Sequence, residues 1–133
     1  MRLLKDTSIE SLTESQCWEY LNANFLGRLA LVGADGVDIF PVNYTANGVD
    51  IFFRTAPGLK MVELTRDPVV AFEVDGADGV MSWSVVVRGK ANRLGSDPEI
   101  ESSHVLQLDS QSPTQKFNYV KIVPRVLSGR RFE

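Results

Sequence analysis

The residues with the clearest chemical potential lie in one short stretch, positions 53–60 (FRTAPGLK). The pattern predicts a strand that ends in Arg54 and Thr55, a Pro-Gly turn, and a helix with Lys60 in its first turn. A lysine is unfavourable there, because a helix N-terminus carries partial positive charge. An anion would remove this conflict, since backbone N–H groups, two cations and a hydroxyl could converge on a phosphate. The alternative is an ordinary loop between two solvated cations.

A second stretch, PVNY at positions 41–44, places a proline inside a predicted strand. Because proline has no N–H to donate, it indicates an edge position with a row of free backbone groups nearby. Such a row could hydrogen-bond the polar rim of a flat heterocycle while Val42 and Tyr44 pack on its face. The alternative is an edge strand that simply enters a hairpin.

A third stretch is WSVVVRG at positions 83–89. Trp83 could stack on a ring, and Ser84 could donate a hydrogen bond to a phosphate or a ring carbonyl. The alternative is that Trp83 packs in the core, which is the commoner fate of tryptophan.

The remaining reactive residue types are few. The single cysteine, Cys17, lies on the apolar side of a predicted helix, where it acts as a small hydrophobe. The single histidine, His104, falls in another predicted helix, and neither residue belongs to a nucleophile motif. With one residue of each kind, no metal site is expected. The arginines at 125, 130 and 131 form either a solvated tail or a group that neutralises a phosphate across a dimer interface.

The elements that must position these residues are mostly strands. A capping box at positions 13–16 opens a helix whose apolar stripe comprises Cys17, Trp18, Leu21 and Phe25, and Gly27 is expected to end it. Asn47-Gly48 is a strong hairpin signal. Strands are predicted at 28–32, 37–44, 49–55, 69–75, 82–94 and 119–127, and further helices at 59–65 and from Asp97-Pro98. Six mostly antiparallel strands with two or three short helices predict a closed or nearly closed β-barrel.

Length and composition agree with this class. The chain has 133 residues, 44% of them hydrophobic, and a net charge of −3. We expect one domain over 1–133, with 1–12 as an N-terminal extension. No apolar run could span a membrane and no secretory signal is recognisable, so a cytoplasmic location is expected. The charge disfavours nucleic acid. Strands 51–53 and 85–87 are apolar on both faces and need a second covering layer, which a homodimer would supply.

Taken in order, these stretches resemble the pyridoxamine 5′-phosphate oxidase-like family of flavin-binding split β-barrels, in its small actinobacterial-type branch. The residues that carry the resemblance are GRLALV (27–32), PVNY (41–44), FRTAPGLK (53–60), VVAFEVD (69–75), WSVVVRG (83–89) and SGRR (128–131). The implied fold is a homodimeric, six-stranded antiparallel split barrel.

The resemblance also implies an FMN-dependent oxidoreductase with a flavin at the dimer interface and a small-molecule substrate. It gives a cofactor-binding role to Pro41, Val42, Asn43, Tyr44, Phe53, Arg54, Thr55, Lys60, Trp83 and Ser84. By this resemblance, Arg54, Thr55 and Lys60 match the family's phosphate-binding residues, and the PVNY backbone would face the isoalloxazine. Trp83 and Ser84 would approach the flavin from the other subunit.

Several alternatives stay open. The chain could be a non-catalytic flavin-binding or sensing module, or a purely structural barrel. A deazaflavin or haem could replace FMN, with His104 as the only candidate axial ligand for haem. The stretch 108–113 lacks a tryptophan that many relatives carry. We also expect the C-terminal segment with which the full oxidase binds its substrate to be absent, since the sequence ends at Glu133. Pyridoxamine phosphate is therefore not the expected substrate.

Overall fold

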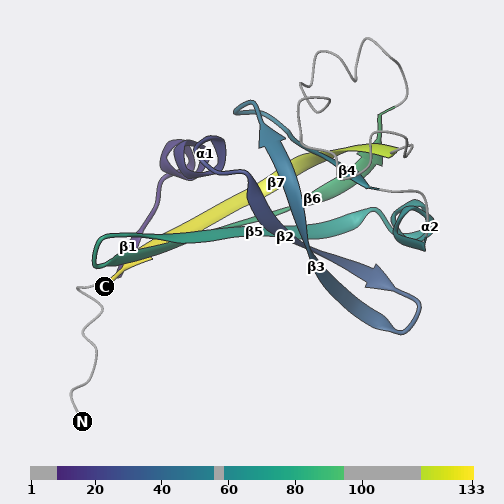
Figure 1. Cartoon of the computed structure of the whole chain (residues 1–133), viewed down its shortest axis with the longest axis horizontal. Helices are drawn as coiled ribbons and strands as arrows, with labels where there is room; N and C mark the ends of the chain where they lie inside the picture. Colours follow the sequence, from purple (N-terminus) through teal and green to yellow (C-terminus); the bar gives the residue numbers. More distant parts are fainter. Residues whose placement is uncertain (1–8, 56–58, 95–117) are drawn as a thin grey trace.

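The computed structural model describes residues 9–55, 59–94 and 118–133, with the backbone alone at 59–62 and 118 (Figure 1). Its elements are β1 (Ile9–Ser11), α1 (Glu14–Asn22), β2 (Leu26–Gly33), β3 (Gly36–Ala46), β4 (Ile51–Thr55), α2 (Leu59–Arg66), β5 (Val69–Asp78), β6 (Met81–Arg93) and β7 (Asn118–Phe132). The six predicted strands and the helix at 59–65 are therefore confirmed, although β4 begins at Ile51 and not at Val49, and β7 continues beyond Leu127 to Phe132. The helix predicted from Asp97 and the stretch 108–113 lie outside the described residues, as does His104.

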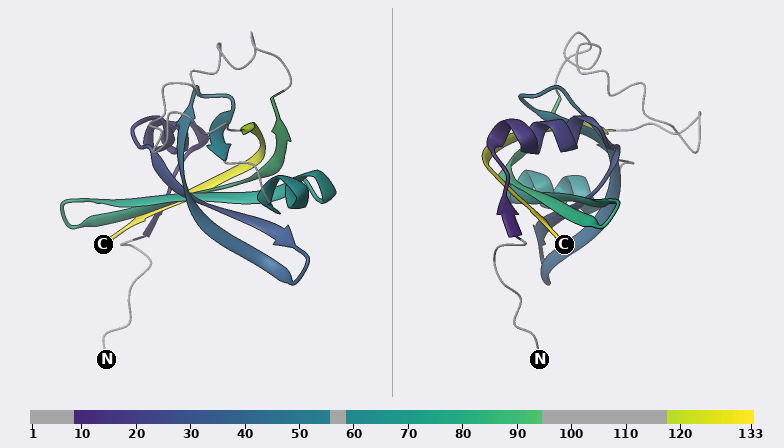
Figure 2. Two further views of the ribbon diagram at one scale, coloured as in Figure 1. Left: turned by 45° about the vertical axis from the view of Figure 1, so that its right-hand side comes forward. Right: turned by 90° about the vertical axis from the view of Figure 1, so that its left-hand side faces the viewer.

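The seven described strands form one antiparallel sheet in the order β1-β7-β4-β3-β2-β5-β6. β6 also pairs with β7 along most of its length, and this contact closes six strands into a barrel (Figure 2). β7 is long enough to serve two further neighbours, because Asn118–Ile122 pairs with β4 and Arg130–Phe132 pairs with β1. Closure removes most of the open strand edges that would otherwise invite aggregation.

Three local predictions differ from the structure. β1 was not predicted, because three exposed residues carry no alternating pattern; it lies in the expected extension 1–12 and pairs with β7. β5 continues through the predicted loop to Asp78. The first helix ends at Asn22 with Ala23 as its C-cap, so the prediction that Gly27 ends it was wrong. Gly27 belongs to β2, where an added Cβ would meet the ring of Phe72.

The capping box that opens α1 is confirmed. The Thr13 Oγ1 accepts a hydrogen bond from the Gln16 N–H at 3.1 Å, and the Thr13 N–H donates to the Gln16 side chain at 2.8 Å. Cys17 and Leu21 face the barrel and are fully buried. Burial, followed by the charge of Glu14, raises the pKa of the Cys17 thiol, so the thiol stays protonated and acts as an apolar side chain.

The core fills the inside of the barrel and extends under both helices. Its largest fully buried side chains are Tyr44, Phe53, Phe72, Leu21, Leu29, Leu31, Ile51 and Ile122. α1 packs on β3, β6 and β7, whereas α2 packs on β2 and β6 at a different end of the barrel (Figure 1). Neither helix in the described part of the chain is long and apolar enough to cross a membrane. Strand alternation thus explains which residues point inward.

A β-bulge marks the contact that closes the barrel. Arg88 pairs with Val126 but Gly89 pairs with Pro124, so Arg125 is an extra residue on β7. Proline is tolerated in a sheet at such an irregularity. An added Cβ on Gly89 would overlap the carbonyl oxygen of Val123, which shows how closely β7 approaches β6 here. The bulge therefore depends on a residue without a side chain.

We expect Gly89→Ala to lower the free energy of unfolding by about 3 kcal/mol, because the clash is with backbone atoms that cannot rotate away. Urea denaturation followed by circular dichroism measures the loss. Lys90→Ala is the matched control: its side chain is exposed on the same strand, and the change should cost no more than about 0.5 kcal/mol. Equal stability of Gly89→Ala and wild type would show that β7 can move away from β6 to make room for the added methyl group.

Candidate functional site

The candidate site lies where the sheet is split between β3 and β4. These strands pair only over Tyr44–Ala46, although β3 pairs with β2 all along Gly36–Asn43. Within the described part of the chain, the portion of β3 before Tyr44 has no strand on its β4 side. The edge position predicted from Pro41 is therefore confirmed, and proline is compatible with it because no ladder hydrogen bond is lost.

Backbone direction along this edge follows from one hydrogen bond. The Tyr44 N–H donates to the Phe25 carbonyl at 2.9 Å, so the backbone groups of Tyr44 point toward β2. Because these groups alternate along a strand, the Asn43 N–H and the Pro41 carbonyl point toward the open edge. The edge thus offers one donor and one acceptor, two residues apart.

The side chains of Val42 and Tyr44 do not lie at this edge. They are 8% and 1% exposed and belong to the barrel core, so the prediction that they pack on the face of a ring was wrong. The hydroxyl of Tyr44 donates to the Leu21 carbonyl at 2.7 Å, and its ring meets Phe72 edge-on. Burial raises the pKa of Tyr44 above its ordinary value. What this strand presents outward is backbone, together with the exposed side chains of Pro41 and Asn43.

The end of β4 carries the predicted phosphate ligands. Phe53 is buried in the core, so its side chain is not available to a cofactor. Arg54 follows it on the outer side of the strand, next to Phe52 by alternation, and its Nη2 atom is buried. Thr55 points to the inner side and is nearly buried. Lys60 is the second residue of α2, as predicted. A single ion could contact Arg54 and Thr55 only beyond the end of the strand, where the sheet no longer separates its two faces.

Trp83 and Ser84 also point to opposite sides of their strand. Trp83 is 4% exposed and stacks on Tyr20 with 4.2 Å between ring centroids, so it packs in the core as the alternative stated. An added Cβ on Gly76 would meet the indole. Sequence reasoning missed this requirement, although a glycine inside a strand is a sign of close approach. Ser84 faces outward with Arg130, its partner across β6 and β7.

Two arginines on the surface of the barrel form ion pairs. Arg28 donates to Glu73 at 2.7 Å and to Asp75 at 2.9 Å, and the hydrogen bonds to Asp75 and Glu73 raise the pKa of the arginine. Arg131 pairs with Glu10 at 2.9 Å. Arg88 and Arg125, by contrast, form no ion pair within the described ranges. Those same ranges hold no group of three or more side chains that could bind a metal ion.

Known proteins resemble this chain in both sequence and fold. A family model described as pyridoxamine 5′-phosphate oxidase matches residues 13–131. The chain belongs to the pyridoxamine 5′-phosphate oxidase family. A Corynebacterium glutamicum protein that is provisionally named a pyridoxamine 5′-phosphate oxidase is 37% identical to this chain. The match covers 96% of each chain, and the two structures superpose with a TM-score of 0.82. The split-barrel fold class is thereby confirmed.

Two other proteins are similar at the sequence level. An FAD binding protein from Mycobacterium smegmatis is 31% identical over 93% of this chain and 98% of its own, with a TM-score of 0.80. An uncharacterized protein from Mycobacterium tuberculosis H37Rv is 33% identical over 85 residues, which is 64% of this chain and 77% of that protein. The resemblance inferred from the ordered sequence stretches is therefore confirmed.

Tyr44→Phe should lower the free energy of unfolding by about 1–2 kcal/mol at pH 7, because the Leu21 carbonyl loses its buried donor. The raised pKa adds a pH dependence. The tyrosine of the unfolded chain ionises at about pH 10, while that of the folded protein stays protonated. Above that pH the free energy of unfolding of the wild type therefore falls by up to about 1.4 kcal/mol per pH unit. Urea denaturation between pH 7 and pH 11.5 should show the difference between the two proteins shrinking above about pH 10. A difference that stays constant over that range would contradict this assignment.

Proposed function

We propose that this chain is an FMN-dependent oxidoreductase that binds its flavin at the interface of a homodimer and acts on a small molecule. The observation that carries the proposal is the meeting of two features at one place. The open edge of β3 lies beside the end of β4, and β4 carries Arg54 and Thr55 directly before α2. One feature suits a flat heterocycle and the other suits a phosphate.

The phosphate end is supported by charge. FMN carries nearly two negative charges on its phosphate, which needs cationic and hydroxyl donors. Arg54 and Thr55 end β4, and α2 begins with Leu59 and Lys60, with no acidic residue in its first turn. The free N–H groups of that turn add further donors. An anion at this end would also account for a lysine at the positive pole of a helix.

The ring end is supported by backbone chemistry. The pyrimidine portion of a flavin offers carbonyl oxygens and an N–H group, which are complementary to the Asn43 N–H and the Pro41 carbonyl. Val42 and Tyr44 contribute to this edge through the strand that they anchor, since their side chains are buried. The donor set therefore fits a flavin in both its charged and its polar portions. When bound, the flavin supplies hydride or electron transfer, so the chain needs no acid–base pair of its own.

A second copy of the chain would complete the site. Large apolar side chains remain exposed on the outer face next to the open edge, including Ile39 at 66% and Leu26 at 53%. Phe52 is not among them, because Leu94 and Tyr119 cover it within the chain. Two residues, Trp83 and Ser84, are predicted to approach the flavin from the partner subunit. The side chain of Ser84 faces outward and suits this role, whereas Trp83 is buried in the core.

A non-catalytic flavin-binding module is the second candidate, because the similar M. smegmatis protein is named for binding and not for a reaction. That protein's name also makes FAD a necessary comparison. The first experiment is the visible absorption spectrum of the purified protein, before and after addition of FMN or FAD and desalting. Retained flavin bands that are bleached by a nicotinamide cofactor and restored by an added acceptor support the oxidoreductase. Retained flavin that never cycles supports the module, and failure to retain either flavin contradicts both.

Lys60→Ala should weaken FMN binding about 10-fold to 150-fold, as expected for about 1.5–3 kcal/mol from a lost charged hydrogen bond. Isothermal titration of FMN into the flavin-free protein measures the change. Arg66→Ala is the control, since Arg66 is exposed at the other end of the same helix. Unchanged FMN affinity in Lys60→Ala would remove Lys60 from the phosphate site.

Ile39→Asp should convert the dimer to a monomer and reduce FMN affinity at the same time, because a carboxylate would have to be desolvated in the interface. Analytical ultracentrifugation and FMN titration test both effects. Val49→Asp is the control, since Val49 is equally exposed but lies in the turn between β3 and β4. A monomeric Ile39→Asp variant with normal FMN affinity would show that one subunit suffices for the flavin.

A further inference from the structure

Three oxygen atoms converge on one point where the β2–β3 hairpin meets α2. A Cβ added to Gly33 would lie 2.6 Å from Oδ2 of Asp38 and 3.0 Å from Oε1 of Glu63. The Gly36 carbonyl oxygen, from the opposite strand of the hairpin, lies 3.2 Å from the same point. Because Gly33 has no side chain, this point stays open. We call these four residues the oxygen cradle.

The oxygen cradle contains only hydrogen-bond acceptors. An ionised carboxylate and a backbone carbonyl have no hydrogen to donate, so the three oxygens repel one another. Glu63 is only 6% exposed. Among the residues that the structure describes, neither the Asp38 nor the Glu63 carboxylate forms an ion pair or a side-chain hydrogen bond. Buried charges in proteins are paired with an opposite charge or coordinate a metal ion, so the cradle requires a positive partner.

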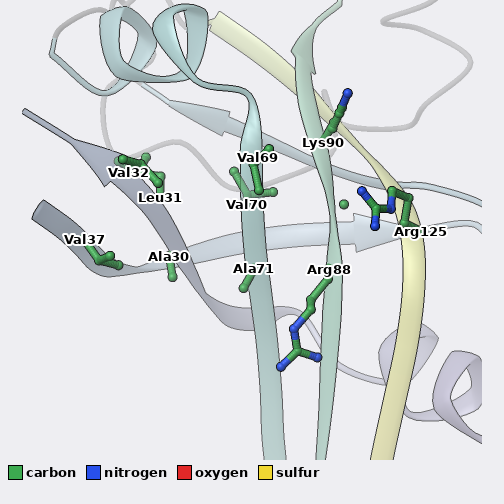
Figure 3. A pocket seen from close by; sticks show the side chains of 11 residues that line it. Ala30, Leu31, Val32, Val37, Val69, Val70, Ala71, Arg88, Lys90 and Arg125 are labelled. Atoms are coloured by element: carbon green, nitrogen blue, oxygen red, sulfur yellow. The ribbon is translucent and has the colours of Figure 1, made fainter.

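The cradle lies on the side of the hairpin that faces away from the proposed dimer contact. Val32 and Val37 line a cavity on the outer face of the barrel, which is the face assigned above to that contact (Figure 3). Gly33 and Asp38 each follow one of these valines, so strand alternation turns them to the other side. There α2 packs against β2 and brings Glu63 to the hairpin. Since Asp38 is exposed, an ion can enter from solvent.

We propose that the oxygen cradle binds a hard divalent cation, Ca²⁺ or Mg²⁺, and thereby fastens α2 to the β2–β3 hairpin. Both ions prefer carboxylate and carbonyl oxygens, and two carboxylates balance the two positive charges. Rotation of the Asp38 and Glu63 side chains brings their oxygens to metal–oxygen distances of about 2.0–2.6 Å, and water completes the coordination. The expectation of no metal site rested on cysteine and histidine, which are zinc ligands, so it does not apply to a site made of oxygens.

Isothermal titration of CaCl₂ and of MgCl₂ into the protein, after treatment with EDTA and desalting, measures the affinity. With three protein oxygens we expect a dissociation constant of about 0.1–1 mM for the preferred ion. About 10 mM of that ion should raise the midpoint of thermal unfolding by about 3–8 °C, because only the folded chain binds it. NaCl at the same ionic strength is the control for charge screening. The ratio of the two affinities distinguishes a Ca²⁺ site from a Mg²⁺ site.

Glu63→Gln and Asp38→Asn each keep the shape of the side chain and remove one charge from the cradle. Each should weaken binding of the ion at least about 10-fold, because affinity depends on the number of charged ligands. Without divalent ions, Glu63→Gln should unfold at the same temperature as the wild type or at a higher one, since a source of repulsion is lost. Asp38 is exposed, so Asp38→Asn keeps the test valid if Glu63→Gln fails to fold.

Gly33→Ala tests the position of the ion without changing any charge. The added methyl group would occupy the centre of the cradle, and its two closest neighbours are the ends of flexible side chains that can rotate away. The variant should therefore fold but bind the ion at least about 10-fold more weakly. Glu19→Gln is the control for net charge, because Glu19 is exposed on α1 and lies outside the cradle. It should bind the ion like the wild type.

The proposal fails if neither ion affects the wild-type protein more than NaCl does. A proton shared between the two carboxylates, or a basic group from a second copy of the chain, would then be the positive partner. Binding to Gly33→Ala with wild-type affinity would also overturn it, because the ion would have to lie elsewhere. Equal weakening in Glu19→Gln would reduce the effect to the net charge of −3. These titrations need no flavin, so their result holds whether or not the chain binds FMN.

Discussion

The limited pairing between β3 and β4 is the constraint on which the candidate site depends. Backbone N–H and C=O groups must find hydrogen-bond partners, and a barrel whose strands were paired along their whole length would satisfy them all internally. Here β3 diverges from β4 before Tyr44 but stays paired with β2. The groups left over are held at fixed spacing by a rigid strand, which makes them suitable for recognition of a polar heterocycle. The core beneath, with Tyr44 bonded to Leu21, keeps that strand in place.

Closure of the barrel on the other side requires a β-bulge, and the bulge reorients one side chain. β7 must pair with β4 at one end and with β1 at the other while following β6 throughout. The bulge at Arg88 and Gly89 adjusts the register between these demands, and a bulge characteristically re-aims a side chain. Arg125 is the side chain that is re-aimed. The unpaired edge of β3 thus exposes backbone groups, and the bulge in the β6–β7 pairing exposes the side chain of Arg125, on the outside of the same barrel.

Periodicity and local signals account for most of what was predictable. The capping box at Thr13, the hairpin at Asn47-Gly48 and the edge position of Pro41 each depend on a few neighbouring residues, and all are found in the structure. The failures involve contacts between distant residues. Gly27 does not end a helix because it lies against Phe72, and β1 exists because β7 is long enough to receive it. No local pattern could reveal either contact, since each partner is far away in the sequence.

Strand alternation explains why residues that are neighbours in the sequence do not lie on one side of the candidate site. Consecutive residues on a strand point to opposite faces, so motifs such as FRT and WS are divided by the sheet itself. Phe53 and Trp83 belong to the core, whereas Arg54 and Ser84 face outward. A ligand therefore contacts alternate residues, exposed backbone at a strand edge, or groups at strand ends where the two faces meet. Within PVNY, this leaves the side chains of Pro41 and Asn43 exposed at the strand edge, whereas those of Val42 and Tyr44 lie in the core.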